Sequence, residues 1–202
     1  MTTRTTQKQQ EREVIKPASL PQELFIKSDA DITIASGSAG SSKSFSILLR
    51  WLRYVNNPNS RGVVFRRTNT QILSQGGLWE DAQRLYRKID PKLKVNIDKQ
   101  KLTFSNGASI QFMHYENEAA KIKFKGLQAD FIAEATEFTE EMFDYLMSRN
   151  RNTNVEHKCT MCAATNPDYD SFLRERIWWW LDPETGIPDP HKRGVVRYFR
   201  RN

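Results

Sequence analysis

The chain has 202 residues, of which 38% are hydrophobic, and its formal net charge at pH 7 is +7. This length suits one domain that buries its core without disulfides, and the two cysteines, Cys159 and Cys162, favour a reducing cytoplasm. No apolar run approaches the roughly 20 residues of a membrane span, and the first residues lack the apolar stretch of a secretory signal. We therefore expect no membrane partner, while the positive charge is compatible with nucleic acid as a partner.

The N-terminal part of the chain changes character at about residue 20. Residues 1–17 are polar and carry no apolar period, so we predict a flexible arm over residues 1–20, followed by a folded core over 21–175. In the core, Ile32–Ala35 is a short apolar run with β-branched residues, which predicts a buried strand. Apolar residues then recur at helical spacing from Phe45 to Val55, which predicts a helix.

Short strands and helices alternate along the rest of the core. The predicted elements are a strand at 63–65, a helix at 78–89, a hairpin of 102–104 and 109–113 around Ser-Asn-Gly, a strand from Phe131, a helix at 139–147 capped by Thr139, and a strand at 159–164. This alternation predicts an α/β fold with a mainly parallel central sheet flanked by helices.

The strongest local signal is the sequence GSAGSSKS between the first predicted strand and the first predicted helix. Small residues let backbone N–H groups converge on phosphate oxygens, and the helix that follows adds the positive end of its dipole. We therefore predict ATP binding here, with Lys43 reaching the β- and γ-phosphates and the Ser44 hydroxyl binding Mg²⁺. The predicted nucleotide-binding residues of this loop are Gly37, Ser38, Ala39, Gly40, Ser41, Ser42, Lys43 and Ser44. Ser42 stands where the usual pattern, G-x-x-x-x-G-K-[ST], has its second glycine.

A phosphate-loop ATPase also needs acids at the end of a buried strand beside the phosphate loop. The segment at 129–135 fills this pattern halfway: Glu134 fits the acid that orients the attacking water, whereas Ala133 stands where a metal-binding acid is expected. Asp130 precedes the apolar residues, so we place it at the opposite end of the strand. Three alternatives stay open. Ala133 is an engineered substitution, or it is natural and Glu134 or Glu137 takes over its role, or the strand is shifted along the sequence.

Polar residues also follow the last predicted strand of the core. Thr165 and Asn166 stand at its tip, where a polar side chain next to the phosphate loop senses the γ-phosphate and couples it to motion. The alternative is an ordinary Asn-Pro turn.

These segments resemble the ATPase domain of the large terminase subunit of tailed bacteriophages. The matching sequences are GSAGSSKSFS, VVFRRTNTQI, FSNGASIQFMHY, KFKGLQADFIAEATEF and TNPDYD, in the family's order, over roughly residues 30–175. The EATEF segment after KGL is the most specific of them. The resemblance implies a P-loop NTPase fold of the additional-strand type and ATP and Mg²⁺ as cofactors. It also aligns the family's two adjacent acids with Ala133 and Glu134.

The resemblance further implies a motor that couples ATP hydrolysis to translocation of double-stranded DNA into a procapsid in the host cytoplasm. Its partners would be the portal protein, the small terminase subunit and further copies of itself in a homo-oligomeric ring. Residues 176–202 would then form a lid or linker toward a C-terminal nuclease domain that this sequence lacks. Two other classes stay open: a helicase-like or repair ATPase on the same core, and a non-hydrolysing nucleotide-binding module, which Ala133 suggests.

Several side chains outside these motifs are further candidates. Hydrolysis in ring motors is usually completed by an arginine, supplied within the subunit or across an interface, and the candidates are Arg66, Arg67 and Arg149. In similar ATPases the region before the first strand contacts adenine, which implies amide pairing by Gln22 and stacking by Phe25; the alternative for Phe25 is core packing.

Overall fold

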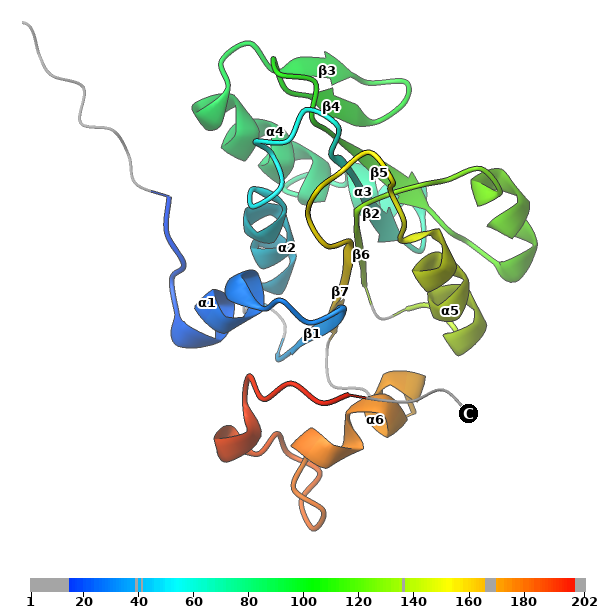
Figure 1. Ribbon diagram of the computed structural model, residues 1–202. Helices are drawn as coiled ribbons and strands as arrows, with labels where there is room; N and C mark the ends of the chain where they lie inside the picture. Colours follow the sequence, from blue (N-terminus) through cyan, green and yellow to red (C-terminus); the bar gives the residue numbers. More distant parts are fainter. Residues whose placement is uncertain (1–14, 39, 41, 136, 166–169, 199–202) are drawn as a thin grey trace, which may run out of the picture.

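The computed structural model describes residues 15–38, 40, 42–135, 137–165 and 170–198, apart from the side chains of residues 132–135 (Figure 1). The strands are β1 Ile32–Ser36, β2 Arg61–Arg66, β3 Lys94–Asn96, β4 Lys101–Thr103, β5 Ser109–His114, β6 Phe131–Ala135 and β7 Thr160–Thr165. The α-helices are α1 Leu20–Lys27, α2 Lys43–Trp51, α3 Asn69–Leu73, α4 Leu78–Ile89, α5 Glu140–Arg149 and α6 Phe172–Ile177. Three 3₁₀ segments among the described residues are η1 Glu118–Phe124, η2 Trp178–Trp180 and η3 Pro190–Lys192.

The strands form one sheet in the order β1-β7-β6-β2-β5-β4-β3. The first five strands in this order run parallel, while β4 and β3 join as an antiparallel hairpin extension of β5. Every residue of β7 is buried, as expected for a strand of a parallel sheet covered on both faces. The predicted α/β fold with a mainly parallel sheet is confirmed.

The position of β7 decides the type of fold. β7 lies between β1 and β6, so one additional strand separates the strand before the phosphate loop from the strand that carries Glu134. The predicted additional-strand arrangement is therefore confirmed. The register pairs Ser36 with Thr165 and Ala135 with Ala164, so the carboxyl ends of β1, β7 and β6 meet at one edge of the sheet.

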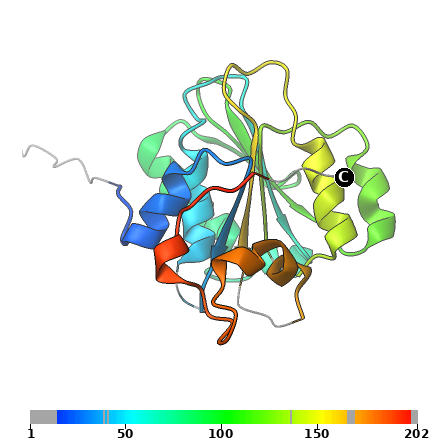
Figure 2. The ribbon, with the colours of Figure 1, turned by 60° about the horizontal axis from the view of Figure 1, so that its bottom comes forward.

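Helices cover both faces of the sheet, with α1, α2 and α4 on one side and α5 and η1 on the other (Figure 2). The first face holds a cluster that includes Trp51, Tyr86 and Phe112. The second face holds a cluster that includes Phe65, Phe124 and Phe143. Among the described residues, no helix is long and apolar enough to cross a membrane.

The predicted elements agree with the structure to different degrees. The hairpin of β4 and β5 and the bounds of α4 are confirmed, and Thr139 caps α5 by accepting a hydrogen bond from the Met142 N–H at 3.3 Å. The helix α2 ends at Trp51 rather than Val55, because the chain continues as i to i+3 turns. Ser19 caps α1, which begins at Leu20, next to the predicted start of the core at residue 21. Residues 1–14 of the arm lie outside the described residues.

Asp130 lies at the amino end of β6, as the sequence predicts, and its side chain is fully buried. Its Oδ1 accepts a hydrogen bond from the Arg61 N–H at 2.6 Å, and its Oδ2 lies 2.7 Å from His157 Nε2. This carboxylate therefore joins β2, β6 and the segment before β7 at the edge of the sheet opposite to the phosphate loop.

Residues 170–198 lie across the carboxyl end of the sheet (Figures 1 and 2). Arg176 anchors α6 to α5 through Glu140 and Asp144, at 2.6 and 2.7 Å. Farther along, the Trp180 indole N–H donates to the Val195 carbonyl at 2.9 Å, whereas Trp178 remains 65% exposed. Whether this segment acts as a lid stays a prediction.

Candidate nucleotide-binding site

The loop between β1 and α2 has the backbone shape of a phosphate loop. Gly40 has φ +79°, and Ser42 has φ 56° and ψ 21°, which is the left-handed region. Left-handed residues turn successive N–H groups toward one side and thus make an anion-binding concavity. The left-handed Ser42 also explains why the usual pattern has glycine at this position, since a side chain there costs roughly 1–2 kcal/mol. Ala39 and Ser41 lie outside the described residues.

Lys43, the first residue of α2, extends back over this loop. Its Nζ donates to the carbonyl of Gly37 at 2.8 Å and to that of Ser38 at 2.6 Å. Partial burial lowers the pKa of Lys43 below its usual value, because desolvation disfavours the ammonium charge. A phosphate oxygen beside the Lys43 ammonium would offset the cost of desolvation. The position of Lys43 is therefore suited to binding an anion.

Ser44 and Arg66 meet at the start of α2. Arg66 ends β2, and its Nη2 donates to the Ser44 Oγ at 3.0 Å. The pair brings a guanidinium to the hydroxyl that the sequence assigns to Mg²⁺, although β7 and β6 separate β1 from β2 in the sheet order. The structure thus brings Arg66 together with the phosphate loop.

Arg67 has a different environment from its neighbour. Its Nη1 lies 3.2 Å from the Glu137 carbonyl and 3.0 Å from Met142 Sδ, so it holds the start of α5. The Glu137 carboxylate in turn accepts a hydrogen bond from the Gln71 side chain at 2.5 Å. Glu137 is therefore tied to α3 through Gln71, a contact that the sequence motifs did not indicate. This geometry argues against Glu137 as a replacement for the acid absent at Ala133.

The backbone register places Ala133 and Glu134 near the carboxyl end of β6. Ala133 pairs with Val64 of β2 and Cys162 of β7, and both neighbours belong to the cluster on the α2 face. Glu134 pairs with Ala163, which belongs to the cluster on the opposite face. The register therefore places position 133 on the face of the sheet that α2 covers, and the assignment of the metal-side position to Ala133 stays a prediction.

Thr165 stands beside the phosphate loop. It ends β7 and pairs with Ser36, and its carbonyl accepts a hydrogen bond from the Gly37 N–H at 3.2 Å. A change at the loop would therefore reach the end of β7 through one hydrogen bond. Asn166 lies outside the described residues.

Gln22 and Phe25 lie on α1 with buried side chains. The Gln22 amide is used internally: Nε2 donates to the Ser46 Oγ at 3.0 Å, and Oε1 accepts from the Ala18 N–H at 2.6 Å. Phe25 belongs to the core cluster and lies under the Arg50 guanidinium. These contacts favour packing for Phe25, and the adenine role of both residues stays a prediction.

Arg149 lies at the opposite edge of the sheet from the phosphate loop. Its carbonyl accepts a hydrogen bond from the Ala129 N–H at 3.3 Å, just before β6 begins, and its Nη1 donates to the Lys125 carbonyl at 3.3 Å. The structure therefore does not bring Arg149 to the phosphate loop of its own chain.

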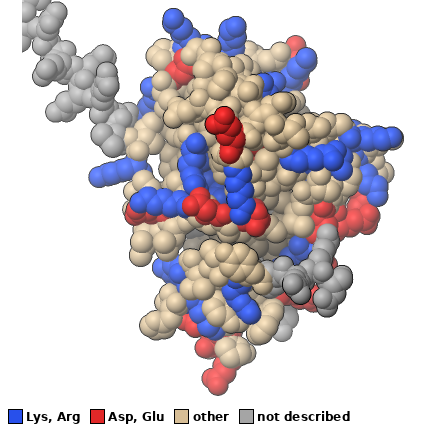
Figure 3. Space-filling view, viewed as in Figure 1, with Lys and Arg blue, Asp and Glu red and all other residues tan. Residues whose placement is uncertain are grey.

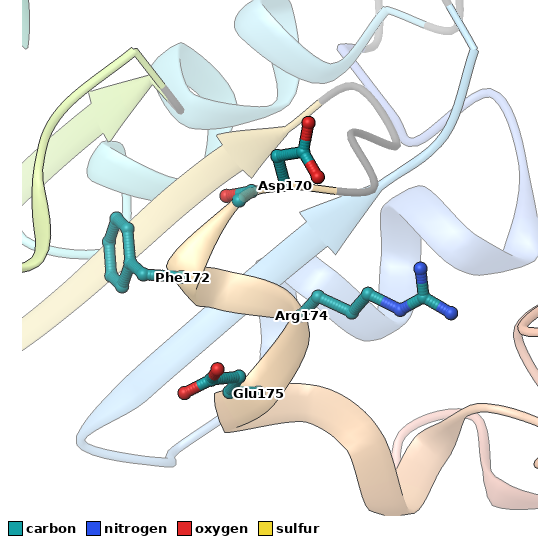
Figure 4. A pocket seen from close by; sticks show the side chains of 5 residues that line it. Asp170, Phe172, Arg174 and Glu175 are labelled. Atoms are coloured by element: carbon teal, nitrogen blue, oxygen red, sulfur yellow. The ribbon is translucent and has the colours of Figure 1, made fainter.

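A depression of about 450 Å³ lies at the start of α6 (Figure 4). Its lining residues are Asp170, Ser171, Phe172, Arg174 and Glu175. None of the described residues of the phosphate loop lines this depression.

Comparison with known proteins decides the family. The family model of the phage terminase large subunit matches residues 29–185. This chain belongs to the phage terminase large subunit family. No curated protein sequence matches it.

Solved structures of large terminases share the fold. The HK97 bacteriophage large terminase matches with a TM-score of 0.58 and 13% identity, over 81% of this chain and 36% of that one. The Thermus phage P74-26 large terminase ATPase domain matches with a TM-score of 0.57 and 16% identity, over 89% and 76%. The large terminase of a thermophilic bacteriophage, solved in complex with ADP, matches with a TM-score of 0.56 and 15% identity, over 74% and 38%. The chain thus spans less than two fifths of the HK97 terminase and of the terminase solved with ADP.

The left-handed serine of the phosphate loop leads to a prediction about stability. We expect Ser42→Gly to raise the free energy of unfolding by about 0.5–1 kcal/mol, since relief of left-handed strain exceeds the entropy that glycine adds to the unfolded chain. Chemical denaturation measures the change. Ser38→Gly is the matched control, because Ser38 is not left-handed and its replacement should destabilise the chain. Equal effects of the two changes would contradict the strain at Ser42.

Proposed function

We propose that this chain is the ATPase motor domain of a phage large terminase, which couples ATP hydrolysis to translocation of double-stranded DNA into a procapsid. The observation that carries the proposal is the convergence of Lys43, Ser44 and Arg66 on a phosphate loop at the carboxyl edge of the sheet. Membership of the terminase family supports the same function. The portal protein, the small terminase subunit, a homo-oligomeric ring and the host cytoplasm are the partners and setting that this function implies.

Nucleotide binding would begin with the phosphates. Backbone N–H groups of the loop and the amino end of α2 would receive the phosphate oxygens. Lys43 would exchange its two carbonyl partners for the β- and γ-phosphates, which replaces neutral acceptors by charged ones. Arg66, held beside Ser44, would contact the γ-phosphate, where negative charge develops during transfer.

Mg²⁺ in nucleotide sites usually binds one or two carboxylates of the protein together with substrate phosphates and water. The carboxyl edge of the sheet offers oxygen donors of this kind. The Ser44 hydroxyl and the Glu134 position at the end of β6 would supply such donors, whereas Ala133 supplies none. When bound, Mg²⁺ neutralises charge on the β- and γ-phosphates.

Hydrolysis would then depend on groups from three strand ends. Glu134 would orient the attacking water, Arg66 would stabilise the charge of the transition state, and Thr165 with Asn166 would couple the γ-phosphate to motion through the Gly37 bond. Arg67 would position the start of α5 rather than touch the nucleotide. Arg149 would act only on the site of a neighbouring copy. Gln22 and Phe25 would border the adenine from α1.

The two adjacent arginines provide the test of this arrangement. We expect the chain to bind ATP more tightly than ADP in the presence of Mg²⁺, and Arg66→Ala to reduce that preference about tenfold to a hundredfold, the value of one charge-assisted hydrogen bond. Arg67→Ala is the matched control, because its guanidinium contacts the start of α5, and it should leave the preference unchanged. Titration with fluorescent ATP and ADP analogues gives both affinities without requiring turnover.

Two results would contradict parts of this proposal. If the unmodified chain bound neither nucleotide, the ATPase assignment would fail. If both nucleotides bound and Arg66→Ala left their ratio unchanged, the role of Arg66 would fail while the nucleotide site remained.

A further inference from the structure

Buried and partly exposed side chains alternate along β4 and the first half of β5. Leu102 and Ile110 are fully buried on the face that α4 covers. Lys101, Thr103 and Gln111 alternate with them along the same strands and remain partly exposed. Because successive side chains of a strand point to opposite faces, these three residues mark a second face of the hairpin, and none of the three belongs to either hydrophobic cluster of the described residues.

The register collects basic residues on this open face. Arg61 pairs with Ser109, Ser109 with Thr103, and Thr103 with Lys94, while Lys101 pairs with Gln111 and Asn96. Residues directly opposite one another on neighbouring strands share a face. Lys99 lies at the turn beside it, where its carbonyl accepts a hydrogen bond from the Gln111 side chain at 3.0 Å. We call this surface the open basic face; it comprises Arg61, Lys94, Asn96, Lys99, Lys101, Thr103 and Gln111.

The basic side chains of the open basic face, Arg61, Lys94, Lys99 and Lys101, form no ion pair with an acid of the described residues. Asp90 lies at the end of α4, where it accepts backbone N–H groups of Lys92 and Ser105. Asp98 is exposed in the turn between β3 and β4.

The cations also repel one another. The pKa of Lys101 is lowered, first by burial and then by the nearby charges of Arg61 and Lys99. Arg61 cannot turn away freely, because its Nη1 donates to the carbonyls of Pro58, Ser60 and Gly107. A polyanion laid across the face would relieve this repulsion. Figure 3 shows lysine and arginine side chains projecting at the end of the molecule that carries the hairpin, with scattered acids between them.

We propose that the open basic face binds the phosphate backbone of double-stranded DNA; this names a contact surface for the motor and rests on the proposed function. The lysines supply charge, and Asn96, Thr103 and Gln111 supply neutral hydrogen bonds of the kind that phosphate oxygens accept. Contact to the backbone alone carries no sequence information, which suits a chain that moves along DNA of any sequence.

This surface is separate from the nucleotide site. Arg61 begins β2, whereas Arg66, at the other end of the same strand, contacts Ser44 at the phosphate loop. Substitutions on the open basic face should therefore leave ATP binding unchanged, and the two activities can be measured independently.

The test is the salt dependence of binding to a fluorescein-labelled duplex of mixed sequence, followed by anisotropy. The variant is Lys94→Ala/Lys99→Ala/Lys101→Ala. The matched control is Lys27→Ala/Arg87→Ala/Lys88→Ala, which removes the same charge from α1 and α4 on the other side of the sheet. One phosphate contact contributes about 0.9 to the slope of log K against log salt, so each lost contact should cost about eightfold in affinity at about 0.1 M salt. We expect the slope of the variant to fall by about 2–3 and that of the control to change much less.

Three results would overturn the proposal. They are equal losses in the variant and the control, an unchanged slope in the variant, and no duplex binding by the unmodified chain. ATP binding is measured on the same samples. If ATP still binds, these results overturn only the DNA-binding surface, whereas absent ATP binding would overturn the proposed function itself. If the triple variant lost its cooperative thermal transition, a double variant would replace it. This variant is Lys94→Ala/Lys99→Ala, and its control is Arg87→Ala/Lys88→Ala, since these four side chains are exposed.

Discussion

Lys43→Ala is expected to weaken the binding of ATP about 10- to 150-fold. The ammonium would exchange its two carbonyl partners for the phosphates, with a net gain equal to one charge-assisted hydrogen bond of about 1.5–3 kcal/mol, and no other lysine is placed to replace it at the described part of the loop. ADP binding should fall less, because Lys43 would keep only its β-phosphate contact there. Isothermal titration with both nucleotides in Mg²⁺ measures the two losses.

Two controls separate this effect from general changes of charge and stability. Lys27→Ala removes an exposed lysine of α1 that pairs with Glu23, and it should leave ATP affinity unchanged. Lys43→Arg keeps the charge but not the compact ammonium, and it should recover little of the affinity, since a guanidinium fits a narrow loop poorly. ATP affinity that survived Lys43→Ala would place the nucleotide elsewhere and remove the central observation of the proposed function.

The sequence predicted the part of the site that depends on local pattern. The spacing of GSAGSSKS between a β-branched run and an amphipathic helix requires a strand, a tight loop and a helix in that order, and this is what β1, the loop and α2 form. Thr139 was predicted as a cap for the same reason, because capping depends on the residue and its immediate neighbours.

Contacts that depend on the order of strands in the sheet could not be predicted from the sequence. Nothing in the residues of β6 states that β7 inserts between it and β1, since strand order follows from long-range packing. For the same reason the sequence left Arg66, Arg67 and Arg149 equivalent. In the structure, Arg66 contacts Ser44 at the phosphate loop, whereas Arg149 lies at the opposite end of the strands.

The helix α1 shows a different limit. Its eight residues have an apolar pattern too short to predict a helix, and Pro21 lies within the first turn. The helix is stabilised by its environment instead, because Ser19 caps it and Arg50 of α2 donates to the Phe25 and Ser28 carbonyls at its end. Gln22, predicted from the family to pair with adenine, fastens the same helix to Ser46.

Ala133→Glu is expected to give the largest gain of activity. The resemblance in sequence aligns position 133 with an acid, and the register sets this position beside Val64 and Cys162 on the face that α2 covers. A metal that polarises the phosphates contributes several kcal/mol to the transition state. Mg²⁺-dependent ATP hydrolysis should therefore rise about 100-fold or more, since each 1.36 kcal/mol is tenfold in rate.

The variant also carries a readout that does not require turnover. Without divalent metal, the added carboxylate should repel the phosphates and weaken ATP binding, and Mg²⁺ should reverse this loss. Ala133→Gln is the matched control, because it has the same shape without the charge and should show neither effect. If the unmodified chain already hydrolysed ATP as fast as the variant, Glu134 would suffice and Ala133 would be a tolerated natural residue. If ATP bound tightly to both and neither turned it over, the non-hydrolysing nucleotide-binding module would replace the motor.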